Sequence, residues 1–164
     1  MPELAGAATS LLAMLDVYAA ATPPDPPVFA HGTFRPNQVL LHQGQIGLID
    51  FDSWCLAEPA LDLALFLTSI KDVGLTAMSK AAQHELGTPL DTAARLAHLA
   101  RLEAICDMFL EHYMTLMPVS RLRVILWEAL ALFALVLRSW DCVKSVRLEN
   151  TMLLLDRHIR RHFV

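Results

Sequence analysis

The spacing of apolar residues changes twice along the first part of the chain. Residues 4–20 carry Leu, Ala and Tyr near helical spacing, and the proline-rich run 22–27 then ends the helix in an extended connector. Residues 39–42 and 46–50 are short runs of β-forming residues separated by Gln-Gly-Gln, in which Gly44 can adopt a positive φ. The pattern therefore predicts a leading helix, a connector and one small hairpin.

The chain after Pro59 has a helical pattern throughout. Pro59 suits the first turn of a helix, and Asp91 and Ser120 suit N-caps, because their side chains can accept unpaired backbone N–H groups. The expected helices lie near residues 60–71, 76–86, 91–116, 120–142 and 148–162. The predicted fold class is α+β and mostly helical, with one small hairpin and about five to six helices.

Length and composition favour a single domain over residues 1–164. The sequence is 55% hydrophobic and 18% charged, against usual fractions of about 45–50% and about 25%. The excess of apolar residues predicts a surface that a partner could cover. Within this domain we expect a leading helix and connector (1–27), a hairpin segment (28–67) and a helical subdomain (68–164).

Charge and cysteine content exclude several classes of protein. The net charge of −4 argues against a general nucleic-acid binder. The longest apolar run, 124–137, contains Glu128 and falls short of the about 20 residues that span a bilayer, so no membrane partner is expected. No signal peptide is visible, and Cys55, Cys106 and Cys142 form no CxxC motif, which predicts reduced thiols in a cytoplasmic protein.

The C-terminal part of the chain is basic. From Arg138 onward, six Lys and Arg residues accompany three acidic residues, a balance more typical of a solvated helix face than of a binding site. His158 and His162 are spaced as a metal-ligand pair, but the arginines beside them favour a solvated helix end.

Two polar loops flank the predicted hairpin. Residues 31–38 precede its first strand, and residues 50–52 follow its second. Because a hairpin brings its outer ends together, Gln38 and Asp50 should lie side by side. A carboxylate beside an amide oxygen is a plausible oxygen-ligand pair for Mg²⁺.

Three strings in this segment carry a family resemblance: HGTFRPNQ, LIDFDSW and EPALDLA. In order and spacing, residues 28–67 resemble the C-terminal lobe of the aminoglycoside phosphotransferase and choline kinase family, which has a protein-kinase-like fold. The resemblance implies ATP-dependent transfer of a phosphoryl group to an alcohol, with Mg²⁺ bound between the loops. For the remaining helices, the resemblance is limited to the helical pattern.

The resemblance assigns roles to individual positions. Thr33 stands where the family has the aspartate that acts as catalytic base, and Gln38 stands where it has an asparagine metal ligand, with Asn37 one position earlier. Asp50 matches the aspartate that chelates Mg²⁺. Because threonine cannot accept a proton near neutral pH, the base is lost unless Asp52 replaces it.

The resemblance implies supporting roles for two more residues. His31 matches a histidine that supports the catalytic loop, and Asp62 should accept backbone N–H groups from the loop that contains His31. Arg35 could face an anionic substrate, although a solvated loop charge is the more ordinary interpretation.

The first 27 residues contain no Gly-rich loop and no lysine, so we expect a C-terminal lobe without its nucleotide-binding N lobe. Three functions then remain open. The chain could be part of a kinase whose N lobe comes from another chain, a pseudokinase module that holds a ligand without chemistry, or an interaction subunit that self-associates through its exposed inter-lobe face. The helix expected at residues 91–116 carries three acidic residues four positions apart: Glu103, Asp107 and Glu111. They could bind a cationic small molecule, and they are equally consistent with a solvated stripe.

Overall fold

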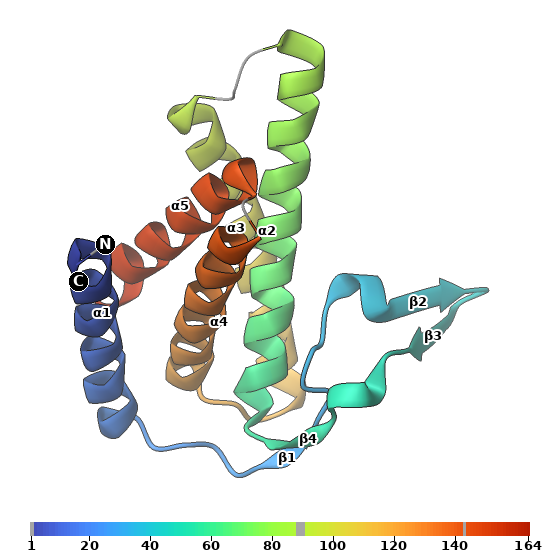
Figure 1. Cartoon of the computed structure of the whole chain (residues 1–164). Helices are drawn as coiled ribbons and strands as arrows, with labels where there is room; N and C mark the ends of the chain where they lie inside the picture. The colour runs from blue at the N-terminus through green and yellow to red at the C-terminus, as the bar shows by residue number, and fades with distance from the viewer. Residues whose placement is uncertain (1, 88–90, 143) are drawn as a thin grey trace.

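The computed structural model describes residues 2–87, 91–142 and 144–164, and within these ranges it contains five α-helices and two small antiparallel strand pairs (Figure 1). The helices are α1 (Pro2–Ala21), α2 (Pro59–Leu86), α3 (Thr92–Leu116), α4 (Arg121–Asp141) and α5 (Ser145–His162). The strands are β1 (Val28–Ala30), β2 (Val39–His42), β3 (Gln45–Leu48) and β4 (Cys55–Ala57), with short 3-10 turns η1 (Pro36–Gln38) and η2 (Phe51–Ser53). The mostly helical α+β class is confirmed.

The prediction of two helices over residues 60–71 and 76–86 is wrong, because α2 continues through the expected break. Its interior glycine, Gly74, lies against α3, and a Cβ there would stand 2.8 Å from Leu102 Cδ1. An interior glycine costs a helix about 1 kcal/mol. Close packing of α3 on α2 offsets that cost, so Gly74 marks a helix contact and not a helix end.

The other boundary signals are confirmed. The Asp91 carboxylate accepts the Ala94 N–H at 2.6 Å at the start of α3. The Ser120 hydroxyl accepts the Arg123 N–H at the start of α4, and Pro59 lies in the first turn of α2. None of the helices described is long and apolar enough to cross a membrane.

Helix α2 is the central element of the core and contacts α3, α4 and α5. Three groups of buried side chains fill the space between these helices and beneath α1. They are Ala60, Leu63, Leu67, Cys106, Leu110 and Val124 near the start of α2; Leu75, Leu99, Leu132 and Leu154 further along; and, between α1 and α4, Leu15, Leu126 and Ala129. Burial raises the pKa of the Cys106 thiol to about 11, so this cysteine stays an unreactive core residue.

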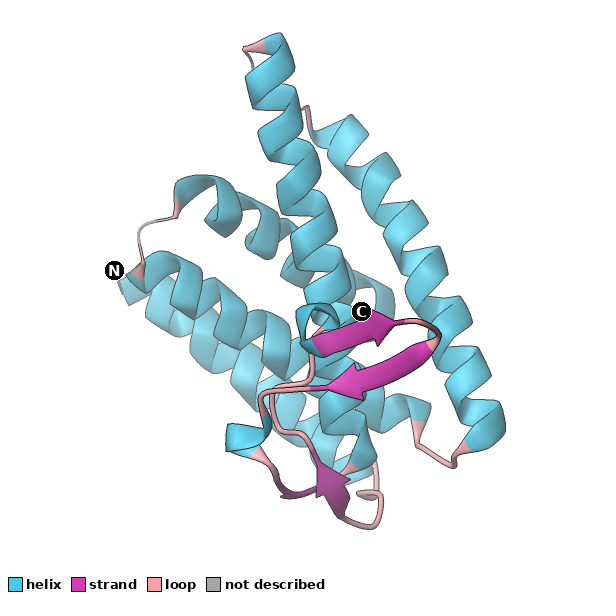
Figure 2. Cartoon of the chain, turned by 90° about the vertical axis from the view of Figure 1, so that its right-hand side faces the viewer, coloured by secondary structure: helices cyan, strands magenta, loops and turns pink. Residues whose placement is uncertain are grey.

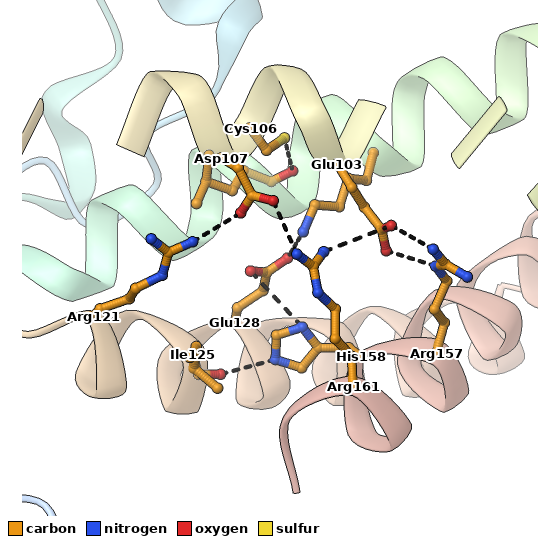
Figure 3. Close-up of polar contacts among 11 residues, drawn as sticks. Glu103, Cys106, Asp107, Arg121, Ile125, Glu128, Arg157, His158 and Arg161 are labelled. Carbon is orange, nitrogen blue, oxygen red and sulfur yellow. Dashed lines mark hydrogen bonds and ion pairs between the residues drawn. The ribbon is translucent and has the colours of Figure 1, made fainter. Parts of the chain in front are cut away.

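The basic C-terminal segment is only partly a solvated face, because three of its arginines bind acidic residues of neighbouring helices, two of them drawn in Figure 3. Arg157 forms two 2.7 Å hydrogen bonds to Glu103, and Arg161 binds Asp107 at 3.0 Å. Arg147 binds Asp72 at 2.6 Å in the same way. Glu103 is itself buried, whereas Asp107 and Glu111 are partly or largely exposed, so Glu103 does not belong to the solvated stripe that was one interpretation of their spacing.

A buried ionic group lies between α2, α4 and α5. Lys71 is bonded to Glu128, and His158 Nδ1 lies 3.9 Å from the other oxygen of the same carboxylate. Burial alone would lower the pKa of Lys71, but Glu128 outweighs it and holds that pKa above its ordinary value. His158 Nε2 bonds the Ile125 carbonyl at 3.0 Å, so this histidine is a core residue, contrary to the solvated helix end that was expected.

We expect the stability of the chain to fall as the pH falls from about 7 towards about 4. Burial lowers the pKa of His158 and, together with His158 and Arg161, lowers that of His162 to about 4. The unfolded chain therefore binds more protons than the folded chain in this range, and protonation favours unfolding. His162 is only half-buried, so solvent screening limits its share to about 1 kcal/mol. Urea unfolding at a series of pH values measures how the free energy of unfolding changes with pH.

The matched control for this pH dependence is His162→Gln, which removes one of the two groups. The variant should show a shallower loss of unfolding free energy between pH 7 and pH 5 than the unaltered chain. An identical slope in both proteins would contradict the assignment to His162.

The strand region combines one predicted and one unpredicted feature. The hairpin of β2 and β3 is confirmed, with Gly44 at φ 77° in its turn. A second pair, β1 with β4, was missed, because its two strands have three residues each and lie more than twenty positions apart in the chain. This pair brings residues 28–30 against the segment that leads into α2, so the first polar loop leaves the sheet directly beside the start of that helix.

Candidate functional site

The two polar loops meet at the base of the hairpin. The Ile49 N–H donates to the Gln38 carbonyl at 3.1 Å, and Gln38 Nε2 donates to Asp50 Oδ2 at 2.7 Å. Gln38 is buried, whereas Asp50 is exposed and has a left-handed backbone conformation at φ 71°. The structure therefore brings Gln38 and Asp50 together, as the hairpin geometry predicted.

His31 anchors the first loop to the second. The residue is 7% exposed, and its Nε2 bonds the Ile49 carbonyl at 2.9 Å. Phe51 lies on the ring at a centroid distance of 4.8 Å, and Phe34 lies at 5.9 Å. These contacts suit a positioning residue, because both ring nitrogens already have partners within the loops.

Asp62 holds the backbone of the first loop at the start of α2. Its carboxylate accepts the His31 N–H at 2.6 Å and the Gly32 N–H at 2.9 Å, which are the backbone contacts that its predicted position required. Gly32 has φ +79°, and a Cβ there would lie 2.1 Å from the Ser53 carbonyl oxygen. Only glycine fits at position 32, because any side chain there would overlap the Ser53 carbonyl where the first loop passes over the second.

Thr33 lies at the centre of the polar contacts. Its hydroxyl is 3.4 Å from His31 Nδ1 and accepts a hydrogen bond from Gln38 Nε2, also at 3.4 Å. The amide of Gln38 thus links the position of the family's base to Asp50. A hydroxyl there can orient a neighbouring group, but it cannot take up a substrate proton near neutral pH.

The other loop candidates lie outside this cluster. Arg35, Asn37 and Asp52 are exposed, and no hydrogen bond or ion pair of the described chain joins them to Thr33, Gln38 or Asp50. A cavity of about 720 Å³ lies elsewhere, between the middle of α2 and the start of α5, and contains none of the predicted site residues. The candidate site is therefore the hydrogen-bonded cluster at the hairpin base.

The cluster does not fit Mg²⁺ in this arrangement. The ion binds through oxygen ligands in near-octahedral geometry. Here the amide nitrogen of Gln38 faces the Asp50 carboxylate, while Gln38 Oε1 is buried without a hydrogen-bond partner. Among the residues that the structure describes, no group of three or more His, Cys, Asp or Glu side chains is placed to hold a metal.

Three further groups support the site and were not predicted. The Ile49 carbonyl and the Ser53 backbone contact the first loop through main-chain atoms, which leave no signature in a sequence. Glu58, directly before α2, receives the Arg123 guanidinium and the Asp25 N–H, and so fastens the connector to α4. The only signal for Glu58 was its place in the EPALDLA string.

The helical body and its two hairpin-linked loops define a mostly helical α+β domain in which residues of the three family-like strings meet. The family model described as the phosphotransferase enzyme family matches residues 2–105, which include both loops and the start of α3. The chain belongs to this family, whose members generally use ATP and Mg²⁺. Comparisons with curated proteins and with solved structures gave no match.

Proposed function

We propose that this chain is a phosphotransferase-family domain whose catalytic loop is incompetent for phosphoryl transfer on its own. The observation that carries the proposal is the bond from the Gln38 amide to Asp50, beside a threonine at the position of the base. The family membership supports the ancestry of the loops, and the cluster supports the loss of their chemistry.

Loss of the catalytic base accounts for one part of the lost phosphoryl-transfer activity. Phosphoryl transfer depends on positioning and charge stabilisation, with a carboxylate that aligns the attacking hydroxyl. General-base assistance typically contributes about 10²–10⁴-fold. Thr33 supplies none of it, and Asp52 is exposed and outside the cluster.

Replacement of the metal ligand accounts for the other part. Gln38 is one methylene longer than an asparagine, and its amide reaches Asp50 directly. That hydrogen bond uses the Asp50 oxygen that a cation would otherwise approach. Asp50 Oδ2 is thereby bonded to a neutral donor, which ties the two loops together.

A second candidate is a domain that retains nucleotide binding and holds a ligand without chemistry. The observation in its favour is the unpartnered Gln38 Oε1, which a half-turn of the amide would present to a cation beside Asp50.

We place either form of the protein in the cytoplasm, because Cys55, Cys106 and Cys142 are free thiols.

Thermal unfolding with ATP and Mg²⁺ distinguishes the two candidates. We expect no Mg²⁺-dependent rise in Tm for the unaltered chain, and the same Tm response in Asp50→Ala. Ligand at 100 times its Kd would stabilise the fold by about 2.7 kcal/mol, which corresponds to roughly 5–10 °C for a chain of this size. A rise of that order that requires both Mg²⁺ and Asp50, without phosphate release from ATP, would favour the second candidate, whereas phosphate release that requires Asp50 would contradict the proposal.

A further inference from the structure

The cavity of about 720 Å³ lies between the middle of α2 and the start of α5. Its α2 wall follows one face of that helix, with Val73 and Ala77 one turn apart and Lys80 about one turn further on. Its α5 wall is the first turn of that helix, which includes Ser145 and Val146. Small-molecule sites in proteins commonly occupy about 300–1,000 Å³, so an organic ligand fits this volume.

The cavity is separate from the cluster at the hairpin base. Figure 2 shows the strands, in magenta, on the side of the molecule that faces the viewer. The cavity contains no residue of these strands or of the two polar loops, because α2, α5 and the residue before α5 form its whole wall. A ligand bound there would not depend on whether the Gln38–Asp50 cluster binds a nucleotide.

The wall of the cavity is positively charged, although the chain has a net charge of −4. Two of the three lysines in the sequence, Lys80 and Lys144, lie in it together with Arg147. Asp72 is the one carboxylate among the described residues of the wall, and Arg147 binds it at 2.6 Å. Since Lys80 is eight residues further along α2, about 12 Å up the helix, Asp72 does not neutralise the lysines.

The start of α5 adds unpaired donors to this charge. Its first helical hydrogen bond runs from the Leu148 N–H to the Lys144 carbonyl, so the N–H groups of the first turn have no helical acceptor. Lys144 is the N-cap residue and forms no capping bond, which places a cation at the positive end of the helix. In the part of the chain that the structure describes, neither the Lys80 nor the Lys144 side chain has a hydrogen bond or an ion pair.

We propose that this cavity binds a small phosphorylated molecule, with its phosphate group between Lys80, Lys144 and the first turn of α5. Phosphate oxygens accept hydrogen bonds from ammonium groups and from the N–H groups at a helix start, and their negative charge offsets both lysines. A phosphate ion alone is far smaller than the cavity. The organic part of the ligand covers the apolar wall formed by Val73, Ala77 and Val146.

Calorimetric titration with phenyl phosphate and with inorganic phosphate tests this site. The unaltered chain should bind phenyl phosphate at least about 10-fold more tightly, because only this titrant presents a ring to the apolar wall. Lys80→Gln/Lys144→Gln should raise its Kd at least about 10-fold. Arg101→Gln/Arg160→Gln removes the same charge from exposed positions of α3 and α5 outside the cavity, and should leave that Kd unchanged.

Ala77→Leu tests the cavity without a change of charge. Ala77 is an exposed residue of α2 in the cavity wall, and leucine keeps the helix propensity while it fills part of the volume. The variant should weaken phenyl phosphate binding more than inorganic phosphate binding. Any of three results would overturn the proposal: no binding of phenyl phosphate at millimolar concentration, equal affinity for the two titrants, or an unchanged Kd in Lys80→Gln/Lys144→Gln.

Discussion

Glu128→Ala is expected to lower the free energy of unfolding by about 3–5 kcal/mol. The side chains of Glu128 and Lys71 are 6% and 11% exposed, and each is the other's ion-pair partner. Removal of the carboxylate leaves the Lys71 ammonium buried without its counterion. Since domains of this size are stable by about 5–15 kcal/mol, the variant should unfold at much lower urea concentrations.

Two controls separate burial from charge in this experiment. Asp156→Ala breaks the Arg160–Asp156 pair, whose side chains are 75% and 55% exposed, and should cost less than about 1 kcal/mol. Lys71→Met/Glu128→Leu removes both charges and should recover most of the loss, because no unpaired ion remains in the core. A Glu128→Ala variant as stable as Asp156→Ala would show that water reaches Lys71.

Thr33→Asp/Gln38→Asn should confer Mg²⁺-dependent ATP hydrolysis about 10²–10⁴-fold above that of the unaltered chain. The aspartate restores a carboxylate at the position of the base. The shorter asparagine no longer reaches the Asp50 carboxylate, which frees an oxygen for the ion. The measurement is phosphate release from ATP with and without Mg²⁺.

The dependence of this gain on Asp50 is its internal control. Asp50→Ala in the double variant should remove the gain, since Asp50 is the carboxylate that the ion would share with the phosphates. Either single substitution should give less than the pair, because each restores one group only. If the double variant binds ATP with Mg²⁺ and still shows no gain, Thr33 and Gln38 are not the source of the deficit.

The local part of the site could be predicted because it depends on neighbours in the chain. A short turn joins β2 to β3, so Gln38 and Asp50 had to meet at the open end. The hydrogen bonds from His31 and Gly32 to Asp62 join residues about thirty positions apart in the chain. They were predicted from the family resemblance and could not have been predicted from the periodicity of apolar residues. The catalytic or metal-binding role of each of these residues stays a prediction.

The amino-acid sequence by itself determined the helical α+β class, the hairpin, the helix caps and the family, because each depends on residues close together in the chain. Only the tertiary structure decided that α2 is continuous, that Arg147, Arg157 and Arg161 bind acidic residues of α2 and α3, and that His158 is buried beside Glu128. The physical reason is that a charged or small residue looks the same in a sequence whether it faces water or a partner. The packing of distant helices decides which of the two it meets.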